Sequence, residues 1–207
     1  MGNTATLLMV KNLMATRINT WFDNLQNRHN ESHNGRAERA ELRRTLPPYG
    51  ALTCAGFRRL ANMLPDLLGG SETRLLALAV FTAVAAHAEG NNREKSFAAQ
   101  LGEKIKGTDR TYLSTLRFER LQRATSPEEF CRLLIRAVKI RGEKGVNLPS
   151  LADGIFLWMA EWQARQHNEA PGIDPFKRNA VRWACEYGQA TQTSVIDETT
   201  AAISDKE

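Results

Sequence analysis

The chain has 207 residues, of which 42% are hydrophobic and 25% are charged, and these values are ordinary for a soluble globular protein of one or two domains. Its longest apolar run, residues 75–88, is shorter than the ~20 residues of a membrane-spanning helix, and its N-terminus lacks the basic segment of a signal peptide. The composition therefore excludes a membrane-spanning protein and predicts a cytoplasmic one without a membrane partner, while the net charge of +5 favours anionic partners.

The first predicted elements are helices. Apolar residues recur at helical spacing near the N-terminus, at Leu7, Val10, Met14, Ile18, Trp21 and Leu25. A polar stretch over 27–35 predicts a loop, and a second helix over 36–44 ends before Pro47-Pro48. The next helix, over 54–64, has Thr53 as its predicted N-cap.

Two further helices complete the first half of the chain. Ser71 is placed to cap a long apolar helix, which Gly90 ends, and residues 96–106 predict a short helix closed by Gly107. Because the run 75–88 is almost entirely apolar, we expect the long helix to be buried in the core.

The second half shows the same pattern of caps and apolar faces. Asp109 is the predicted start of a helix that contains LRFERLQR, residues 116–123. Ser126 then occupies an N-cap position, with Pro127 as the first residue of a helix that Gly142 ends. Two more helices have apolar faces: Leu151, Ile155, Trp158 and Trp162 in one, and Phe176, Ala180, Trp183 and Tyr187 in another, which Asp174-Pro175 opens.

No segment alternates apolar and polar residues as a strand would, so the predicted fold class is all-α, with two small helical bundles packed together. We expect an N-terminal helical domain over 1–108, a C-terminal helical domain over 109–190 and a polar acidic tail over 191–207. Residues 189–207 lack apolar periodicity, which predicts disorder or loose order there.

Motifs that carry catalytic chemistry are missing from the sequence. A phosphate-binding loop, HExxH and GxSxG are all absent, so we expect no enzymatic activity and no cofactor. His29 and His33 lie four apart in an Asn-rich stretch without enough further ligands for a metal site. Structural positions are expected for three other groups of residues: the cysteines (Cys54, Cys131 and Cys185, as reduced thiols), His87, and the tryptophans Trp158, Trp162 and Trp183.

Positive charge is concentrated between residues 110 and 144, which hold nine Arg and Lys against four Glu. Arg132, Arg136 and Lys139 fall on one face of the 127–141 helix, opposite its apolar residues, and such a ladder suits contact with phosphates. A solvated face paired with Glu128 and Glu129 is the alternative.

The stretch LRFERLQR is unusual because its arginines fall within its apolar arc. On a helical wheel Arg117 lies between Leu113 and Leu121, and Arg120 lies between Leu113 and Leu116. We interpret some of these arginines as half-buried between the two domains, where guanidinium groups face phosphate or pair with carboxylates, and the wheel does not determine which arginines these are.

An ordered series of motifs resembles a known family. LRFERLQRA is followed by a capped FCRLLIRAVKI, by LPSLADGIFLW and by VRWACEYG, and AELRR, FRRLANML and SFAAQLG precede them. Their order, from about Glu38 to Gly188, is similar to that of the CasB small subunit of the type I-E CRISPR surveillance complex, Cascade. The resemblance implies an all-helical, two-domain, non-catalytic subunit that associates with other Cascade subunits and with a second copy of itself.

The resemblance further implies binding to guide RNA, target DNA and the displaced DNA strand, through basic residues on the backbone. The matching positions are Arg43, Arg44, Arg123 and Arg136, and plausible extensions are Arg117, Arg120, Arg132 and Lys139. Two other functions stay open on the residues alone: an independent helical DNA-binding protein of the repressor type, and a helical adaptor whose basic face contacts an acidic protein.

Overall fold

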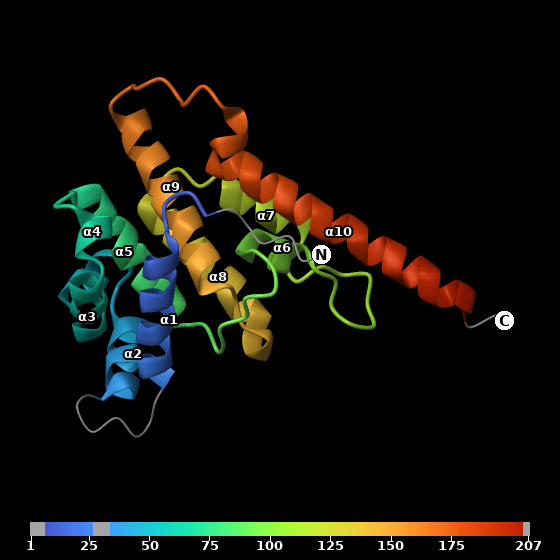
Figure 1. Cartoon of the computed structure of the whole chain (residues 1–207), viewed down its shortest axis with the longest axis horizontal. Helices are drawn as coiled ribbons and strands as arrows, with labels where there is room; N and C mark the ends of the chain where they lie inside the picture. The colour runs from blue at the N-terminus through green and yellow to red at the C-terminus, as the bar shows by residue number, and fades with distance from the viewer. Residues whose placement is uncertain (1–6, 27–33, 205–207) are drawn as a thin grey trace.

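The computed structural model describes residues 7–26 and 34–204, with side chains up to residue 192. The helices of the first half are α1 (Asn12–Gln26), α2 (Gly35–Arg44), η1 (Tyr49–Thr53), α3 (Ala55–Met63), α4 (Pro65–Leu68), α5 (Glu72–Ala85) and α6 (Phe97–Gly102). The helices of the second half are α7 (Thr115–Gln122), α8 (Pro127–Arg141), η2 (Gly142–Lys144), α9 (Leu148–Gln166), η3 (Pro175–Lys177) and α10 (Asn179–Ser204). Figure 1 shows α2, α3 and α4 at one end and α10 extending away at the other.

The all-α prediction is confirmed over the described residues. Extended pairing there is limited to two isolated bridges, one between Asn91 and Val146 and one between Lys104 and Thr111. Helices α2, α5, α8 and α9 occupy the predicted segments, and the serine caps are confirmed: the Ser71 hydroxyl accepts from the Arg74 amide at 3.4 Å and the Ser126 hydroxyl from the Glu129 amide at 3.2 Å.

The core is built around α5. From Ala77 to Ala85 every residue of this helix is buried, because it packs against α8 and α9 from the second half as well as against α3 and η1 from the first. One continuous hydrophobic cluster joins both halves of the chain. The domain boundary near residue 108 therefore stays a prediction, with helices from both sides of it contributing to a shared core.

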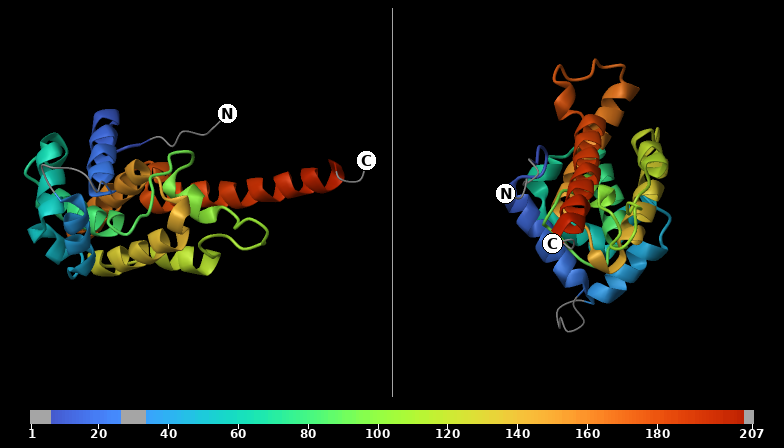
Figure 2. Two further views of the ribbon diagram at one scale, coloured as in Figure 1. Left: turned by 90° about the horizontal axis from the view of Figure 1, so that it is seen from below. Right: turned by 90° about the vertical axis from the view of Figure 1, so that its right-hand side faces the viewer.

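The last helix docks through aromatic side chains. Trp183 of α10 contacts Phe97 of α6 and Phe130 of α8, with ring centroids 5.7 and 6.1 Å apart. Trp158 of α9 stacks on Phe130 with centroids 4.1 Å apart. The core placement of Trp158 and Trp183 is thus confirmed, and Trp162 is half-buried against the same cluster. Beyond this contact α10 extends past the body of the molecule (Figure 2).

Two predicted helix starts are wrong. Helix α7 begins at Thr115 with Ser114 as N-cap, whereas Asp109 lies in a turn closed by the Lys104–Thr111 bridge and pairs with Lys104 at 3.2 Å. Thr53 ends η1, and its hydroxyl donates to the Gly50 carbonyl at 2.9 Å. In both cases a tighter local turn uses the side chain that would otherwise cap the helix.

The cap of α3 is supplied by another helix. Its N-cap residue is Cys54, which makes no side-chain capping bond, and a carboxylate oxygen of Glu41 on α2 accepts from the Ala55 amide at 3.0 Å. A capping partner fourteen residues away leaves no local sequence signal.

Two further boundaries differ from the predictions. Asp174-Pro175 opens η3 rather than α10, so Phe176 is 70% exposed and Ala180 is also exposed. The short helix α6 ends at Gly102 rather than at Gly107. The expectation of disorder or loose order over residues 189–207 stays a prediction, and α10 continues through this segment as far as Ser204, where no Gly or Pro follows Gly188. The predicted loop at 27–35 lies largely outside the described residues, as do His29 and His33.

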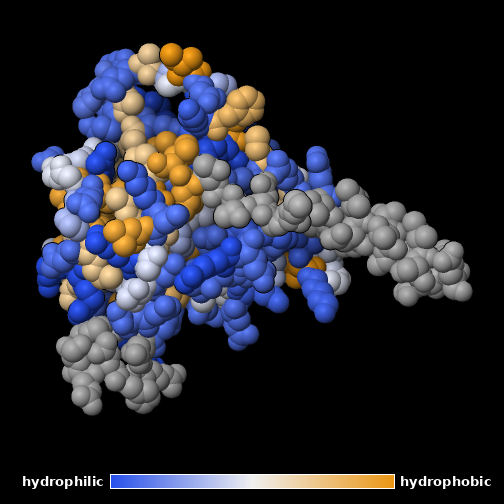
Figure 3. Space-filling model, viewed as in Figure 1, coloured by the Kyte–Doolittle hydropathy of each residue, from blue (hydrophilic) through white to orange (hydrophobic). Residues whose placement is uncertain are grey.

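Exposed apolar side chains mark the loop between α9 and α10, which stands at the top of Figure 3. Ile173 is fully exposed there, next to the largely exposed Phe176.

Candidate nucleic-acid interface

A groove of about 380 Å³ runs between α7 and α8. Its lining combines four basic side chains with four aliphatic ones: Arg117, Arg120, Arg136 and Lys139, and Leu113, Leu121, Leu133 and Ile140. Each helix contributes two of the cations, and no carboxylate belongs to the lining. We call this feature the α7–α8 groove.

The orientation of α7 is set by a narrow buried stripe. Phe118 and Leu121 are buried, and the Phe118 ring stacks on Tyr187 of α10 with centroids 4.1 Å apart. Leu116 is 78% exposed, so the apolar arc inferred from the wheel was too wide. Arg117 and Arg120 are therefore exposed residues on the groove side of α7, and the expectation of half-buried arginines is wrong for them.

The opposite wall follows from the amphipathic pattern of α8. Phe130, Leu134 and Val138 are buried in the core. This packing leaves Arg136 and Lys139 exposed at the edge of the groove, with Leu133 and Ile140 between the two walls.

The other four predicted site residues do not line the α7–α8 groove. Arg123 is exposed at the end of α7 and pairs with Glu119 at 3.5 Å, and Arg132 is exposed on α8. Arg43 lies on α2 and donates from Nε to the Ala86 carbonyl at 2.8 Å. Arg44 lines a separate depression of about 530 Å³ beside Glu41 and Thr45.

A second basic cavity, of about 300 Å³, lies between α1 and α2 and includes residues that the sequence analysis did not select. Arg36 and Arg39 line it together with Arg43. Arg39 donates to the Ala86 carbonyl at 2.9 Å, to Gln26 at 2.6 Å and also to the Ala88 carbonyl. Burial and the nearby Arg43 lower the pKa of Arg39. Residues 36, 39 and 43 are separated by three and four positions, which places their side chains on one face of a helix. This spacing is the sequence signal from which the group of three arginines could have been predicted.

His87 is influenced by cations of two other helices. It follows the last turn of α5, is half-buried, and feels the charges of Lys139 on α8 and of Arg43 and Arg39 on α2. Burial first, and these three cations next, lower its pKa from 6.5 to about 4. The charges of Arg43 and Lys139, which lie on different helices, therefore both act on His87.

We expect His87 to make stability depend on pH. Its pKa in the folded protein lies below its ordinary value, so the unfolded chain binds the proton more readily between pH 6.5 and 4. The free energy of unfolding should be fully retained above pH 6.5 and should fall as the pH drops toward 4. Urea unfolding at pH 7.5 and 4.5 measures this loss.

The control for this expectation is His87→Asn, which removes the titration. Carboxylates such as Glu161, whose pKa is raised by burial, titrate in both proteins and cancel in the comparison. A loss between the two pH values that is equal in wild type and His87→Asn would contradict the expectation.

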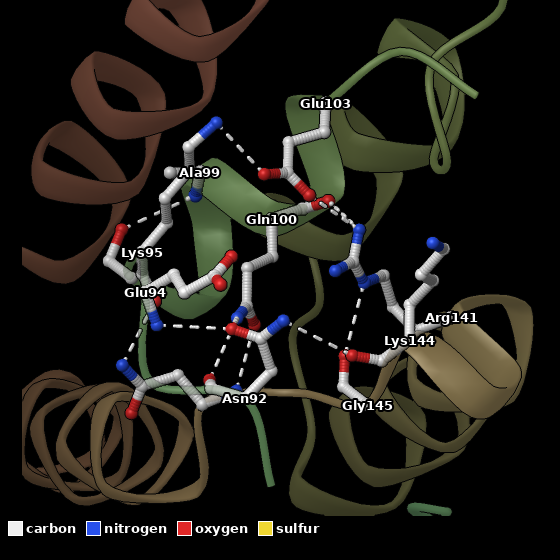
Figure 4. A network of polar contacts seen from close by, with 11 residues as sticks. Asn92, Glu94, Lys95, Ala99, Gln100, Glu103, Arg141, Lys144 and Gly145 are labelled. Atoms are coloured by element: carbon white, nitrogen blue, oxygen red, sulfur yellow. Dashed lines mark hydrogen bonds and ion pairs between the residues drawn. The ribbon is translucent and has the colours of Figure 1, made fainter. Parts of the chain in front are cut away.

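Arg141 anchors the end of α8 and is the buried arginine of this region, only 3% exposed. Its Nη1 donates to Glu103 at 2.7 Å and to the Gln100 carbonyl at 2.9 Å, and its Nε donates to the Gly145 carbonyl at 3.2 Å (Figure 4). The guanidinium also lies 4.2 Å from the ring centroid of Tyr112. Arg141 therefore holds together the end of α6, the segment leading into α7 and the last turn of α8, which carries two groove residues.

Other reactive groups have structural positions. Cys131 is buried, and burial raises the pKa of its thiol to about 12. In the part of the chain that the structure describes, no cluster of three or more His, Cys, Asp or Glu is placed to hold a metal. None of the helices in that part is long and apolar enough to cross a membrane.

The fold and the groove define an all-helical protein with a cationic surface that is built from several helices. A family model, CRISPR-associated protein Cse2, matches residues 38–187. The chain belongs to this family, and Cse2 is the CasB small subunit of the type I-E Cascade complex. The match begins within α2 and ends within α10, and it includes all the groove residues. Separate searches of curated proteins and of solved structures found no match.

Proposed function

We propose that this Cascade small subunit binds the backbone of guide RNA and target DNA and of the displaced DNA strand, and so stabilises the R-loop without a catalytic role. The observation that carries the proposal is the α7–α8 groove, where four cations from two helices converge and no carboxylate lines the surface. Phosphates on a nucleic-acid strand are the common polyanion that fits such a cluster. Sequence selection is left to pairing between guide and target.

The remaining predicted residues extend this surface. Arg43 and Arg44 would add positive charge on α2, and Arg123 and Arg132 would add exposed charge on α7 and α8. The charges of Arg43 and Lys139 both act on His87. A second copy of the chain beside the first would lengthen the same track. The two alternatives are less well supported. A repressor needs one helix aimed at base edges, whereas the cations of the groove come from two helices. An adaptor needs a partner protein with an acidic surface.

We expect the double variant Arg117→Ala/Arg136→Ala to weaken target-DNA binding by the assembled complex. Each lost phosphate contact should flatten the slope of log K against log salt by about 0.7–0.9 of a unit. The loss should be similar for different targets, because phosphates carry no base identity. Binding is measured at several salt concentrations, with each single variant beside the double one.

The matched control is Arg58→Ala, which removes one exposed positive charge from α3, a helix that does not contribute to the groove. An unchanged affinity and slope in the double variant would rule out the groove as a phosphate site. A loss confined to some target sequences would instead indicate base readout, as in a repressor.

A further inference from the structure

We propose that the α7–α8 groove selects unpaired nucleotides over duplex, with a base resting on its aliphatic floor while the flanking phosphates contact its cationic walls. This inference rests on the proposed function and names the class of strand that the same site takes.

The floor is the first observation. Leu113, Leu121 and Leu133 are buried beneath the groove, and Ile140 is 36% exposed within it. A phosphate gains nothing from aliphatic contact, and a site for backbone alone would be lined with donors. Because the three leucines are already buried, an occupant of the groove gains chiefly by removing the apolar surface of Ile140 from water.

The walls are the second observation. The cations on each wall are three residues apart, about 4.5 Å along the helix axis, so each wall holds one pair of positive charges. The groove therefore presents charge on two sides of an apolar strip. Its volume of about 380 Å³ falls within the range of sites that hold small organic groups.

Of the polyanions, an unpaired strand matches this arrangement best. In a duplex the bases are stacked inside and the phosphates face outward, so no apolar face is available to the floor. An unpaired nucleotide offers both a flat apolar base and charged phosphates. Three of the four cations are arginines, whose planar guanidinium also stacks on bases, and this favours a nucleic acid over an acidic peptide.

The test uses the full-length protein and three fluorescent probes of equal length: oligo(dT), an abasic DNA strand and a DNA duplex. The abasic strand keeps the phosphates and lacks the bases. We expect oligo(dT) to bind about five- to tenfold more tightly than either of the others at moderate salt, which is at the low end of what contact with one base contributes.

Variants of the floor and of the wall separate the two contributions. Ile140→Ser should lower the affinity for oligo(dT) toward that for the abasic strand and leave the abasic affinity unchanged. Ile140→Phe should tighten oligo(dT) binding alone, because it adds a stacking surface. Lys139→Ala should weaken both strands by the same factor, because a lysine supplies charge without a planar group that stacks on bases, and Arg58→Ala should change neither. Because Ile140 is partly exposed, its variants should keep the thermal midpoint of the wild type.

Equal affinities for oligo(dT) and the abasic strand, with no effect of either Ile140 variant, would overturn the inference and leave backbone binding intact. Tighter binding of the duplex would overturn it as well. If none of the three probes binds, or if an acidic amphipathic peptide binds in their place, the proposed function fails together with the inference.

Discussion

Replacing Arg141 by alanine is expected to lower the free energy of unfolding by about 3–5 kcal/mol, which is the usual effect of removing one partner of a buried ion pair. The Arg141 side chain is 2% exposed, and its loss leaves the carbonyls of Gln100 and Gly145 without their donor. Glu103 keeps its ion pair with Lys95, at 2.9 Å, and is therefore not left without a partner. The loss of stability should for this reason fall toward the lower end of the range. For a chain of this length the thermal midpoint should drop by roughly 6 °C or more.

Two control variants accompany this measurement. Arg141→Lys keeps the positive charge and lacks the planar fork that reaches three acceptors, so it should lose an intermediate amount of stability. Arg132→Ala removes an exposed arginine from the same helix and should leave the midpoint within about 1 °C, since surface substitutions change stability little. A midpoint for Arg141→Ala equal to that of Arg132→Ala would show that the network around Arg141 does not support the fold.

Trp158→Ala is expected to destabilise the protein by about 3–5 kcal/mol, because a large buried side chain is removed and the cavity fills only partly. Trp158 is 4% exposed and stacks on Phe130, which in turn contacts Trp183, so the substitution opens the junction of α8, α9 and α10. Thermal or urea unfolding of the purified protein measures the effect.

Trp162 provides the comparison for Trp158. It lies on the same helix, one turn later, and is only half-buried, so Trp162→Ala should destabilise less. An unchanged midpoint for Trp158→Ala together with weaker nucleic-acid binding would mean that Trp158 is a stacking platform and that its assignment to the core is wrong.

Local signals predicted the helices whose ends depend on neighbouring residues. Ser71 and Ser126 each accept from the amide three residues later, so all the atoms of the cap lie within one turn of chain. The cap of α3 could not be predicted in this way, because Glu41 reaches it from another helix. The prediction that Asp109 starts the helix was wrong for a related reason. Its partner Lys104 belongs to a turn that closes before α7 begins.

The candidate site was predicted in its composition and only partly in its arrangement. The family resemblance and the charge between residues 110 and 144 marked eight basic residues, and four of them line the α7–α8 groove. Which four do so depends on how far α7 and α8 are rotated about their own axes. Packing of Phe118 on Tyr187 sets this rotation for α7, and Tyr187 is distant in sequence.

The sequence by itself determined the helical fold class, the positions of the capped helices and the basic character of the second half, because each depends on spacing within a few residues or on composition. Only the tertiary structure decided that Arg117, Arg120, Arg136 and Lys139 share one groove with an aliphatic floor, that Arg141 is buried, and that burial and cations of two other helices lower the pKa of His87. Those features depend on contacts between helices, and the free energy of such contacts depends on burial and distance in three dimensions.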